Sequence, residues 1–299
     1  MKHFLPTIAA LPLLAGCVVA VDNRPAPPPT PASSAPAVPK TLQWLHGSGE
    51  AAILSRQAYR QMVRFVLAAD AARKQGKPVD GAVLVTGATP DAPRWAQCGA
   101  KPAAIVLDMD ETAILNTGAN YDGATRPDAG FDAARWDAWE KGGAPYVEPV
   151  PGAREALAQV RAAGITPIFI SNRLSANATG AIDALATAGL GPAVHDQTLF
   201  LRNDVAPGSG KDPRRQAVAA RWCVLAMMGD QLGDFSDAFN TPTLSVQGRR
   251  TLAQSPAVAA KWGAGWFLLP NPVYGSGVAG TLDDLFPADK RWSGPSETH

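Results

Sequence analysis

Three short apolar runs, each ending abruptly in polar residues, constrain the fold of this chain more than any other feature. They occupy residues 103–107, 166–170 and 223–228. Uninterrupted apolar runs of this length predict strands that are covered on both faces. Helix-like stretches at 152–163, 176–188 and 213–221 alternate with them. We therefore predict an α/β fold, a three-layer sandwich around a mostly parallel, Rossmann-like sheet.

The segments around the first strand predict added elements at the edge of this sheet. Apolar residues near helical spacing predict a helix over 42–75, and glycines and prolines predict a loop with short structure over 81–99. A Trp-rich stretch at 120–149 interrupts the strand–helix rhythm. We expect one domain over 41–299, with a small, largely helical cap built from about 41–100 and 113–150.

The first residues are typical of a targeting segment. Lys2 precedes an apolar stretch that is too short to span a bilayer, and this stretch ends in Leu14-Ala15-Gly16-Cys17. Small residues before a Cys resemble the bacterial lipoprotein signal. We predict a signal peptide over 1–16 and acylation of Cys17. The alternative is a plain secretory signal with an incidental Cys.

The residues that follow Cys17 predict a tether. Residues 24–40 are rich in Pro, Ala and Ser and contain too little apolar surface to fold. A Pro-rich chain extends by about 3.1 Å per residue. Each buried CH₂ of an acyl chain contributes roughly 0.8 kcal/mol to membrane binding. Residues 17–40 would therefore hold the domain at a distance from a membrane.

The charge balance and the cysteine content disfavour a nucleic-acid-binding protein and a zinc protein. The chain has 27 Lys plus Arg against 26 Asp plus Glu, which gives no reason to expect a nucleic-acid polymer as partner. Besides Cys17 it contains Cys98 and Cys223, with no Cys-x-x-Cys pair that would predict zinc. A disulfide between them stays open, because their separation in sequence says nothing about distance. Cys223 begins an apolar run and is predicted to be a small buried hydrophobic residue.

The polar residues at the ends of the runs predict one site. Ligands of open α/β sheets bind beyond the carboxyl ends of the strands, so the three clusters should converge. Asp108 and Asp230 would bring together carboxylates that need a cation, and few hard oxygen ligands suit Mg²⁺. Asp110 could exchange a proton with a leaving oxygen and with water. Ser171 and Lys211 are donors of the kind a transferring phosphoryl group needs.

Each of these residues has a simpler interpretation when it is taken alone. An Asp-x-Asp pair is often a turn, Asp230 or Asp234 could cap a helix, and a lone Lys211 would often be solvated. Along the chain, however, they occur in a fixed order. The first apolar strand is followed by DxDxT, the second by Ser, then comes Lys211, and the third apolar strand is followed by GDxxxD. This order favours a single active site over coincidence.

The same order resembles the haloacid-dehalogenase-like superfamily, and within it the class C acid phosphatases, which are bacterial outer-membrane lipoproteins also described as 5′-nucleotidases. The resemblance covers roughly residues 44–282. It rests on Trp44 with Ser48-Gly49-Glu50, Asp108-Met109-Asp110-Glu111-Thr112, Trp136 and Trp139, Ser171-Asn172-Arg173, Lys211 with Arg214, Gly229-Asp230 with Asp234-Phe235, and the run from Pro270 to Ser276. The family's usual Gly-Asp-Asn is Gly229-Asp230-Gln231 in this chain.

The resemblance implies roles for these residues. Asp108 would be the nucleophile and Asp110 the acid/base. The backbone carbonyl of Asp110 would bind Mg²⁺ together with Asp108 and Asp230, and Asp234 would support this metal site. Ser171, Asn172 and Lys211 would form the phosphate site. Trp136 and Tyr274 would flank a nucleobase or another flat leaving group, with core packing as the alternative for these two aromatic residues.

The function that the resemblance implies is an acid phosphatase that hydrolyses phosphomonoesters, including nucleoside 5′-monophosphates, through an aspartyl-phosphate intermediate. The partners would be a small phosphomonoester and the outer membrane, reached by export and the lipid on Cys17, with a homodimer left open. Two alternatives share the fold: a binding or storage protein of weak activity, which the intact Asp108 disfavours, and another phosphohydrolase of the superfamily.

Overall fold

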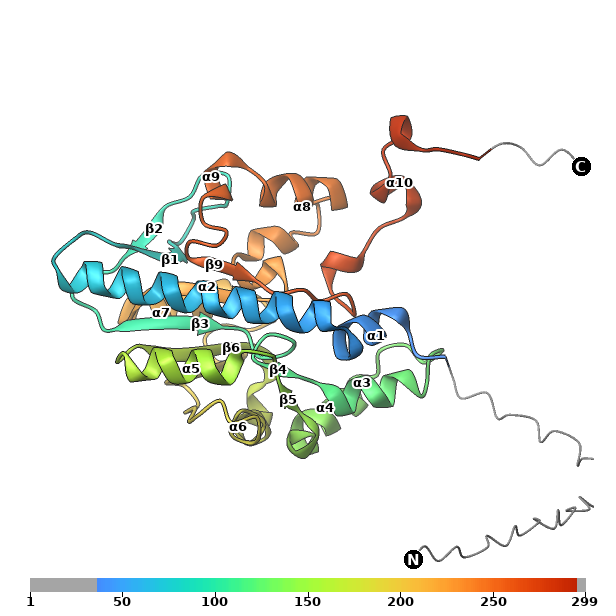
Figure 1. The fold of residues 1–299 in the computed structure, drawn as a ribbon, viewed down its shortest axis with the longest axis horizontal. Helices are drawn as coiled ribbons and strands as arrows, with labels where there is room; N and C mark the ends of the chain where they lie inside the picture. Colours follow the sequence, from blue (N-terminus) through green and yellow to red (C-terminus); the bar gives the residue numbers. More distant parts are fainter. Residues whose placement is uncertain (1–36, 295–299) are drawn as a thin grey trace, which may run out of the picture. The chain divides into compact units, whose positions relative to one another are not determined.

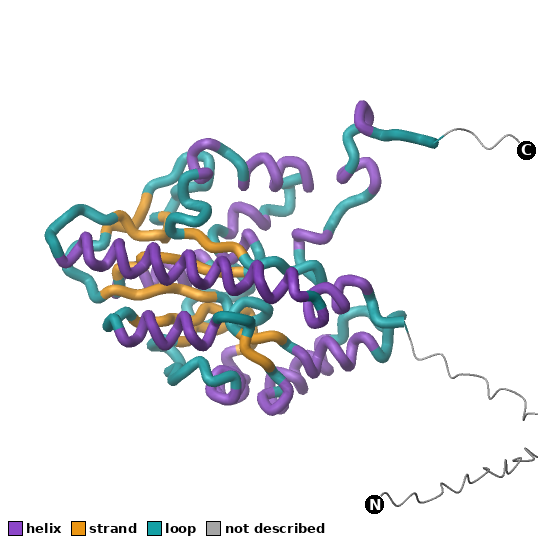
Figure 2. Tube along the Cα trace, in the orientation of Figure 1, coloured by secondary structure: helices purple, strands orange, loops and turns teal. Residues whose placement is uncertain are grey.

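A five-stranded parallel sheet forms the centre of the protein. The computed structural model describes residues 37–294. The strand order is β7-β6-β3-β8-β9, and each strand pairs in parallel with its neighbours. These strands are β3 (Ala103–Leu107), β6 (Thr166–Leu174), β7 (Leu199–Arg202), β8 (Cys223–Gly229) and β9 (Trp266–Leu268). The predicted α/β fold with a mostly parallel sheet is confirmed, and Figure 2 shows the strands surrounded by helices.

Helices on one side of the sheet form the first covering layer. Ile105 and Leu107 of β3 face this layer and are fully buried. The layer consists of α2 (Gly49–Lys74), α5 (Ala153–Ala162) and α6 (Ala178–Thr187). In Figure 1, α2 runs along the sheet, and it contacts α5, β8 and β9. The helix predicted over 42–75 is thus largely α2, after the short α1 (Lys40–Gly47), and most of its length covers the sheet face.

The opposite side of the sheet is covered by a mixed layer. Ala104 and Val106 of β3 point to this side, because successive strand residues alternate between faces. The layer contains the antiparallel pair β1 (Asp80–Leu84) and β2 (Trp95–Gln97), helices α7 (Asp212–Arg221), α8 (Val246–Ala253) and α9 (Pro256–Ala259), and the 3-10 helices η3 (Leu232–Asp234) and η4 (Asp237–Asn240). The C-terminal α10 (Leu282–Leu285) lies beyond it and exposes apolar side chains.

The Trp-rich insertion leaves and re-enters the domain through a short pair of strands. β4 (Ile114–Leu115) pairs antiparallel with β5 (Glu148–Pro149). Between them lie α3 (Thr117–Ala124) and α4 (Ala133–Gly142), followed by a 3-10 turn at Ala144–Tyr146. Helix α4 crosses α6 so closely that a Cβ at Gly180 would overlap the carbonyl of Glu140. The boundaries of about 41–100 and 113–150 as a cap stay a prediction.

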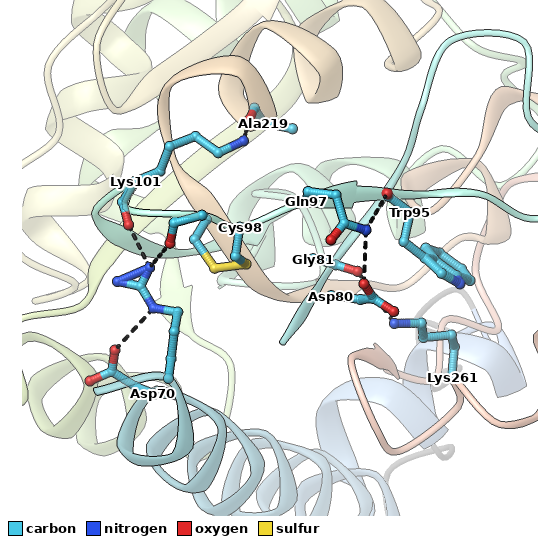
Figure 3. Close-up of a disulfide and its surroundings, with 12 residues drawn as sticks. Asp70, Asp80, Gly81, Trp95, Gln97, Cys98, Lys101, Ala219 and Lys261 are labelled. Carbon is cyan, nitrogen blue, oxygen red and sulfur yellow. Dashed lines mark hydrogen bonds and ion pairs between the residues drawn. A yellow bond between two sulfur atoms is a disulfide. The ribbon is translucent and has the colours of Figure 1, made fainter. Parts of the chain in front are cut away.

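A disulfide joins Cys98 to Cys223, which resolves the open question of their pairing. Cys98 follows β2 and Cys223 begins β8, with 4.4 Å between their Cα atoms. Figure 3 shows Lys101 beside the bridge, where its Nζ donates to the carbonyl of Ala219 at 2.7 Å. Both cysteines are buried, so the prediction of a buried residue at 223 holds, and the side chain is also covalently bonded.

Two strands of the five-stranded sheet were not predicted from the sequence. β7 and β9 are the edge strands, and they contain only four and three residues. Runs this short do not separate from buried helix or loop segments by periodicity. Trp266 of β9 is fully buried, where its ring packs edge-on against Trp95 at 5.5 Å and its Nε1 donates to Ala82.

Candidate active site

The three polar clusters lie at one edge of the sheet. β6, β3 and β8 are adjacent and parallel, so their carboxyl ends lie side by side. Asp108 follows β3, Ser171 lies in the second half of β6, and Asp230 follows β8. The amide of Asp108 donates to the carbonyl of Met228 at 2.9 Å, so the β3–β8 ladder continues to the edge of the site.

Three carboxylates and one ammonium form the centre of this edge. Oxygens of Asp108, Asp230 and Asp234 all lie within 4.8 Å of one another. Nζ of Lys211 lies 2.5 Å from Asp108 Oδ1 and 2.6 Å from Asp234 Oδ1. Gly229 is required here, because a Cβ at this position would collide with the Asp234 side chain. All four charged side chains are nearly buried.

The charges of this group do not balance, because three carboxylates surround one lysine. Burial and the neighbouring carboxylates raise the pKa of Asp108 well above its usual range, although Lys211 opposes the shift. Burial disfavours the charged form of Lys211, but Asp108 and Asp234 overcome it and raise its pKa. Burial and Asp234 raise the pKa of Asp230 to about 7. A bound cation would relieve this repulsion, and the oxygen donors suit a hard divalent ion.

The carboxylate of Asp110 is held apart from this centre by Arg173. Arg173 is buried and donates from Nη2 and Nε to Asp110 Oδ1 at 2.8 and 3.0 Å. Ser171 Oγ donates to Oδ2 at 3.2 Å, and Asn116 Nδ2 to Oδ1 at 3.1 Å. Burial alone would raise the pKa of Asp110, but the charge and hydrogen bonds of Arg173 and its neighbours hold it below the usual value.

Asp230 receives hydrogen bonds from two other segments and from the residue that follows it. Thr112 Oγ1 donates to Oδ1 at 2.8 Å, and Asn271 Nδ2 donates to Oδ2 at 2.8 Å. Gln231 Nε2 also donates to Oδ2, at 3.2 Å. These contacts hold the Asp230 carboxylate at a place where one of its oxygens lies within 4.8 Å of an oxygen of Asp108. Thr112 and Asn271 were quoted in the sequence only as parts of motifs, and their contacts with Asp230 span 118 and 41 residues, so they carry no local signal.

Glu111 is a buried acid that sequence analysis did not single out. Its φ of 53° lies in the left-handed region, which is unusual for Glu. Its carboxylate accepts hydrogen bonds from the backbone and side chain of Asn116, from Asn120 and from the Tyr274 hydroxyl. Burial and the charge of Asp110 raise the pKa of Glu111 to about 7, against the lowering effect of these hydrogen bonds.

The residues predicted to bind phosphate surround the Asp108 cluster. Lys211 is buried at the start of α7, and its ammonium is committed to carboxylates. Asn172 is exposed, and its Oδ1 accepts from Arg214 Nη2 at 2.6 Å. Arg214 also donates to the carbonyl of Ser171 and is buried, so it fixes the end of β6.

A cavity of about 620 Å³ opens above the cluster. Nearly all the predicted site residues line it, and Ser171 reaches it through Asp110. Three aromatic residues, which we call the aromatic wall, are part of its lining: Trp136, Tyr274 and the exposed Phe131, which was not predicted. Trp136 and Tyr274 thus face the same space as Asp108, whereas core packing would have hidden them from it. Cys17 lies outside the described residues, and within residues 37–294 no helix is long and apolar enough to cross a membrane.

Chemically, the site presents a carboxylate at the cavity wall, a second carboxylate held apart from it, cationic and hydroxyl donors, and a group of acids that could hold a cation. This combination, at the carboxyl ends of a parallel α/β sheet, defines a phosphohydrolase of the haloacid-dehalogenase-like class. Residues 66–277 match the family described as HAD superfamily, subfamily IIIB (acid phosphatase). The chain belongs to this family, and the predicted family is confirmed.

Solved structures of similar fold agree with this assignment. The class C acid phosphatase from Bacillus anthracis matches with a TM-score of 0.59 and 23% identity, over 79% of this chain and 84% of the other. The same enzyme with tungstate bound matches with the same values. At this identity the likeness shows the fold alone. A comparison with curated protein sequences gives no match.

Proposed function

We propose that the protein hydrolyses phosphomonoesters, including nucleoside 5′-monophosphates, through an aspartyl-phosphate on Asp108 with Mg²⁺ as cofactor. The observation that carries the proposal is the position of Asp108. Its carboxylate lies on the wall of the cavity, 2.5 Å from a lysine ammonium and within 4.8 Å of two further carboxylates. A nucleophile in this surrounding would meet a phosphoryl group beside a positive charge.

In the first step, an oxygen of Asp108 would attack phosphorus and form a new O–P bond while the ester P–O bond breaks. Asp110 would give its proton to the departing alcohol oxygen. Arg173 lowers the pKa of Asp110 and so favours its ionised form, which means that the proton-donating form is populated only in acidic solution. This dependence agrees with membership of an acid phosphatase family.

In the second step, water would attack the phosphorus of the aspartyl-phosphate. Asp110, now ionised, would accept a proton from that water while the bond to Asp108 breaks. Inorganic phosphate would leave, and both aspartates would return to their starting states. The bonds from Arg173, Ser171 and Asn116 would hold Asp110 in one place through both steps.

Asp108, Asp230 and the carbonyl of Asp110 would hold Mg²⁺, with Asp234 in support. The ion would supply positive charge against the carboxylates and the phosphoryl oxygens. Lys211 and Ser171 would bind the phosphate, with Asn172 at its edge. The surplus of buried negative charge at Asp108, Asp230 and Asp234 supports a cation at this place.

The aromatic wall supports a flat leaving group. Trp136 and Tyr274 line the same cavity as the nucleophile, and Phe131 lies with them. Stacking against such rings would favour nucleosides and aryl alcohols over small aliphatic ones. The similar Bacillus anthracis enzyme binds tungstate, which is an oxyanion as phosphate is.

The proposal is tested with nitrophenyl phosphate and purified protein, with and without a chelator. Wild type should release phosphate, and the chelator should abolish the reaction until Mg²⁺ is restored. Asp108→Asn is nearly isosteric and should keep the fold but lose turnover by several orders of magnitude. Asp289→Asn, at an exposed position outside the cavity, is the matched control and should retain full activity. Activity of Asp108→Asn within about tenfold of wild type would refute the covalent route.

We also propose that the protein is exported and anchored to the outer membrane by a lipid on Cys17. The disulfide supports export, because disulfides persist in oxidising compartments outside the cytosol. Cys17→Ser should move the protein from the membrane fraction to the soluble fraction, or block its processing. A soluble wild-type protein whose mature N-terminus carries no lipid would contradict the anchor.

A further inference from the structure

The side chain of Gln231 links the carboxylate centre to the aromatic wall. Its Nε2 donates to Asp230 Oδ2 at 3.2 Å and to the backbone carbonyl of Tyr274 at 3.1 Å. The two acceptors are 44 residues apart in the sequence (274 − 230), one after β8 and one after β9. A primary amide carries two N–H donors, so one side chain can make both bonds at once.

The segment that carries Tyr274 is packed directly on this side chain. Gly275 has a φ of +93°, and a Cβ at this position would collide with the Gln231 amide. At its other end, the Tyr274 hydroxyl donates to the carboxylate of Glu111. Tyr274 is therefore fixed at two points, its backbone by Gln231 and its hydroxyl by Glu111.

Both fixing residues follow directly after aspartates of the reaction centre. Glu111 comes after Asp110, and Gln231 after Asp230. The position of the Tyr274 ring is thus tied to the groups that would act on phosphorus. A ring that stacks on a leaving group helps only if it stands at the correct distance from the reacting atoms.

We propose that Gln231 is a positioning residue that determines leaving-group specificity. By holding the Tyr274 backbone, it sets the ring against a flat leaving group while phosphorus lies at Asp108. This inference rests on the proposed phosphatase function, and it assigns Gln231 no contact with the reacting atoms. It makes the enzyme selective for aryl and nucleoside phosphates over small aliphatic esters.

Gln231→Asn isolates this role, because it keeps the amide and the charge but shortens the side chain by about 1.5 Å. The shorter amide can still reach Asp230 but not the carbonyl of Tyr274. For an adenosine 5′-phosphate substrate, kcat/KM should fall about tenfold, mainly through KM, as loss of one positioning hydrogen bond predicts. For glycerol phosphate, kcat/KM should stay within about twofold of wild type. The Mg²⁺ concentration for half-maximal activity should also be unchanged.

A double-mutant cycle asks whether Gln231 acts through Tyr274. In a Tyr274→Ala background, Gln231→Asn should cause no further loss with adenosine 5′-phosphate. Tyr274→Phe, which keeps the ring but loses the bond to Glu111, should raise KM for adenosine 5′-phosphate. The proposal is overturned if Gln231→Asn costs the same in both backgrounds, lowers activity on glycerol phosphate equally, or raises the Mg²⁺ requirement.

Binding of adenosine, measured by calorimetry, separates this inference from the proposed function, because it needs no turnover. Wild type should bind adenosine, and Gln231→Asn should weaken binding about tenfold. If wild type binds adenosine in this manner but hydrolyses no phosphomonoester, the proposed function fails while the role of Gln231 in holding the wall stands. If wild type does not bind adenosine, or the variant binds it equally well, the inference is wrong.

Discussion

The disulfide between Cys98 and Cys223 should stabilise the fold strongly and leave the chemistry untouched. The perturbation is its removal, either by refolding wild type under reductant or by the double substitution to Ala. The bridge closes a loop across a sequence separation of 125 residues, which is most of the αβ core. A crosslink over so long a loop removes much entropy from the unfolded chain.

The loop length sets the expected magnitude. The chain-entropy relation for a loop of this size gives about 5 kcal/mol at 25 °C, and measured bridges typically contribute about 2–4 kcal/mol. We expect reduction to lower the free energy of unfolding by about 3–5 kcal/mol. For a domain of this size each kcal/mol shifts Tm by about 2 °C, so Tm should fall by roughly 6–10 °C.

Equilibrium urea unfolding of oxidised and reduced wild type measures this difference in the free energy of unfolding. The Ala double variant shows how much further the free energy of unfolding falls when the sulfur atoms are missing. Below the reduced Tm, turnover should stay within about twofold of the oxidised protein. β8 has seven residues at about 3.3 Å each, so the bridge lies about 20 Å from Asp230 at the other end of the strand. Equal urea midpoints for the oxidised and reduced forms, or two free thiols in unfolded, unreduced protein, would refute this reasoning.

Two further predictions concern the metal and its ligands. Asp230→Ala removes one metal ligand, so activity should fall steeply and recover in part at high Mg²⁺. Asp110→Asn should keep a near-normal Mg²⁺ dependence, with a low turnover that improves for substrates with good leaving groups. The same metal dependence and leaving-group sensitivity in both variants would contradict this division. The pKa of Asp230 is raised to about 7 in the metal-free folded protein. Between about pH 4 and 7, the folded protein therefore holds a proton on Asp230 that the unfolded chain has lost. The contribution of Asp230 to the stability of the metal-free fold therefore falls as pH rises from about 4 to 7. A cation that binds Asp230 must displace this proton, so it binds more readily at higher pH. The rise in Tm on adding Mg²⁺ should be larger at about pH 8 than at about pH 5, and equal shifts at the two values would oppose the prediction.

The core of the fold could be predicted because its central strands are continuous apolar runs that are covered on both faces. β3 and β8 consist almost entirely of buried apolar residues, and α5 and α6 are followed by Gly164 and Gly189, which have positive φ. β7 and β9 could not be predicted in the same way. A strand of three or four residues at the edge of a sheet is specified by the neighbour with which it pairs, and not by its own periodicity.

The charged centre of the site was also accessible from sequence, because parallel strands bring their carboxyl ends together. Asp108, Asp230 and Lys211 meet within hydrogen-bonding or ligand distance, as the order of motifs predicted. The surrounding contacts were not accessible. Arg173 on Asp110 and Glu111 on Tyr274 depend on rotamers and loop paths that only the folded chain defines.

Pairing of the cysteines was beyond sequence reasoning for a related reason. Cys98 lies in a segment broken by glycine and proline, and its position depends on how the β1–β2 pair packs against the sheet. A separation of 125 residues excludes any local signal for pairing.

The central claim is that Asp108 becomes phosphorylated during turnover. The most direct measurement is acid quenching of wild type during steady-state hydrolysis of nitrophenyl phosphate, followed by mass analysis of the peptide that contains residue 108. Asp110→Asn is included because slowed attack by water should make the intermediate accumulate. We expect the mass of one phosphoryl group on Asp108, more of it in Asp110→Asn, and none in Asp108→Asn. Rapid turnover with no phosphorylated peptide in either active protein, or with the phosphoryl group on another residue, would contradict the account.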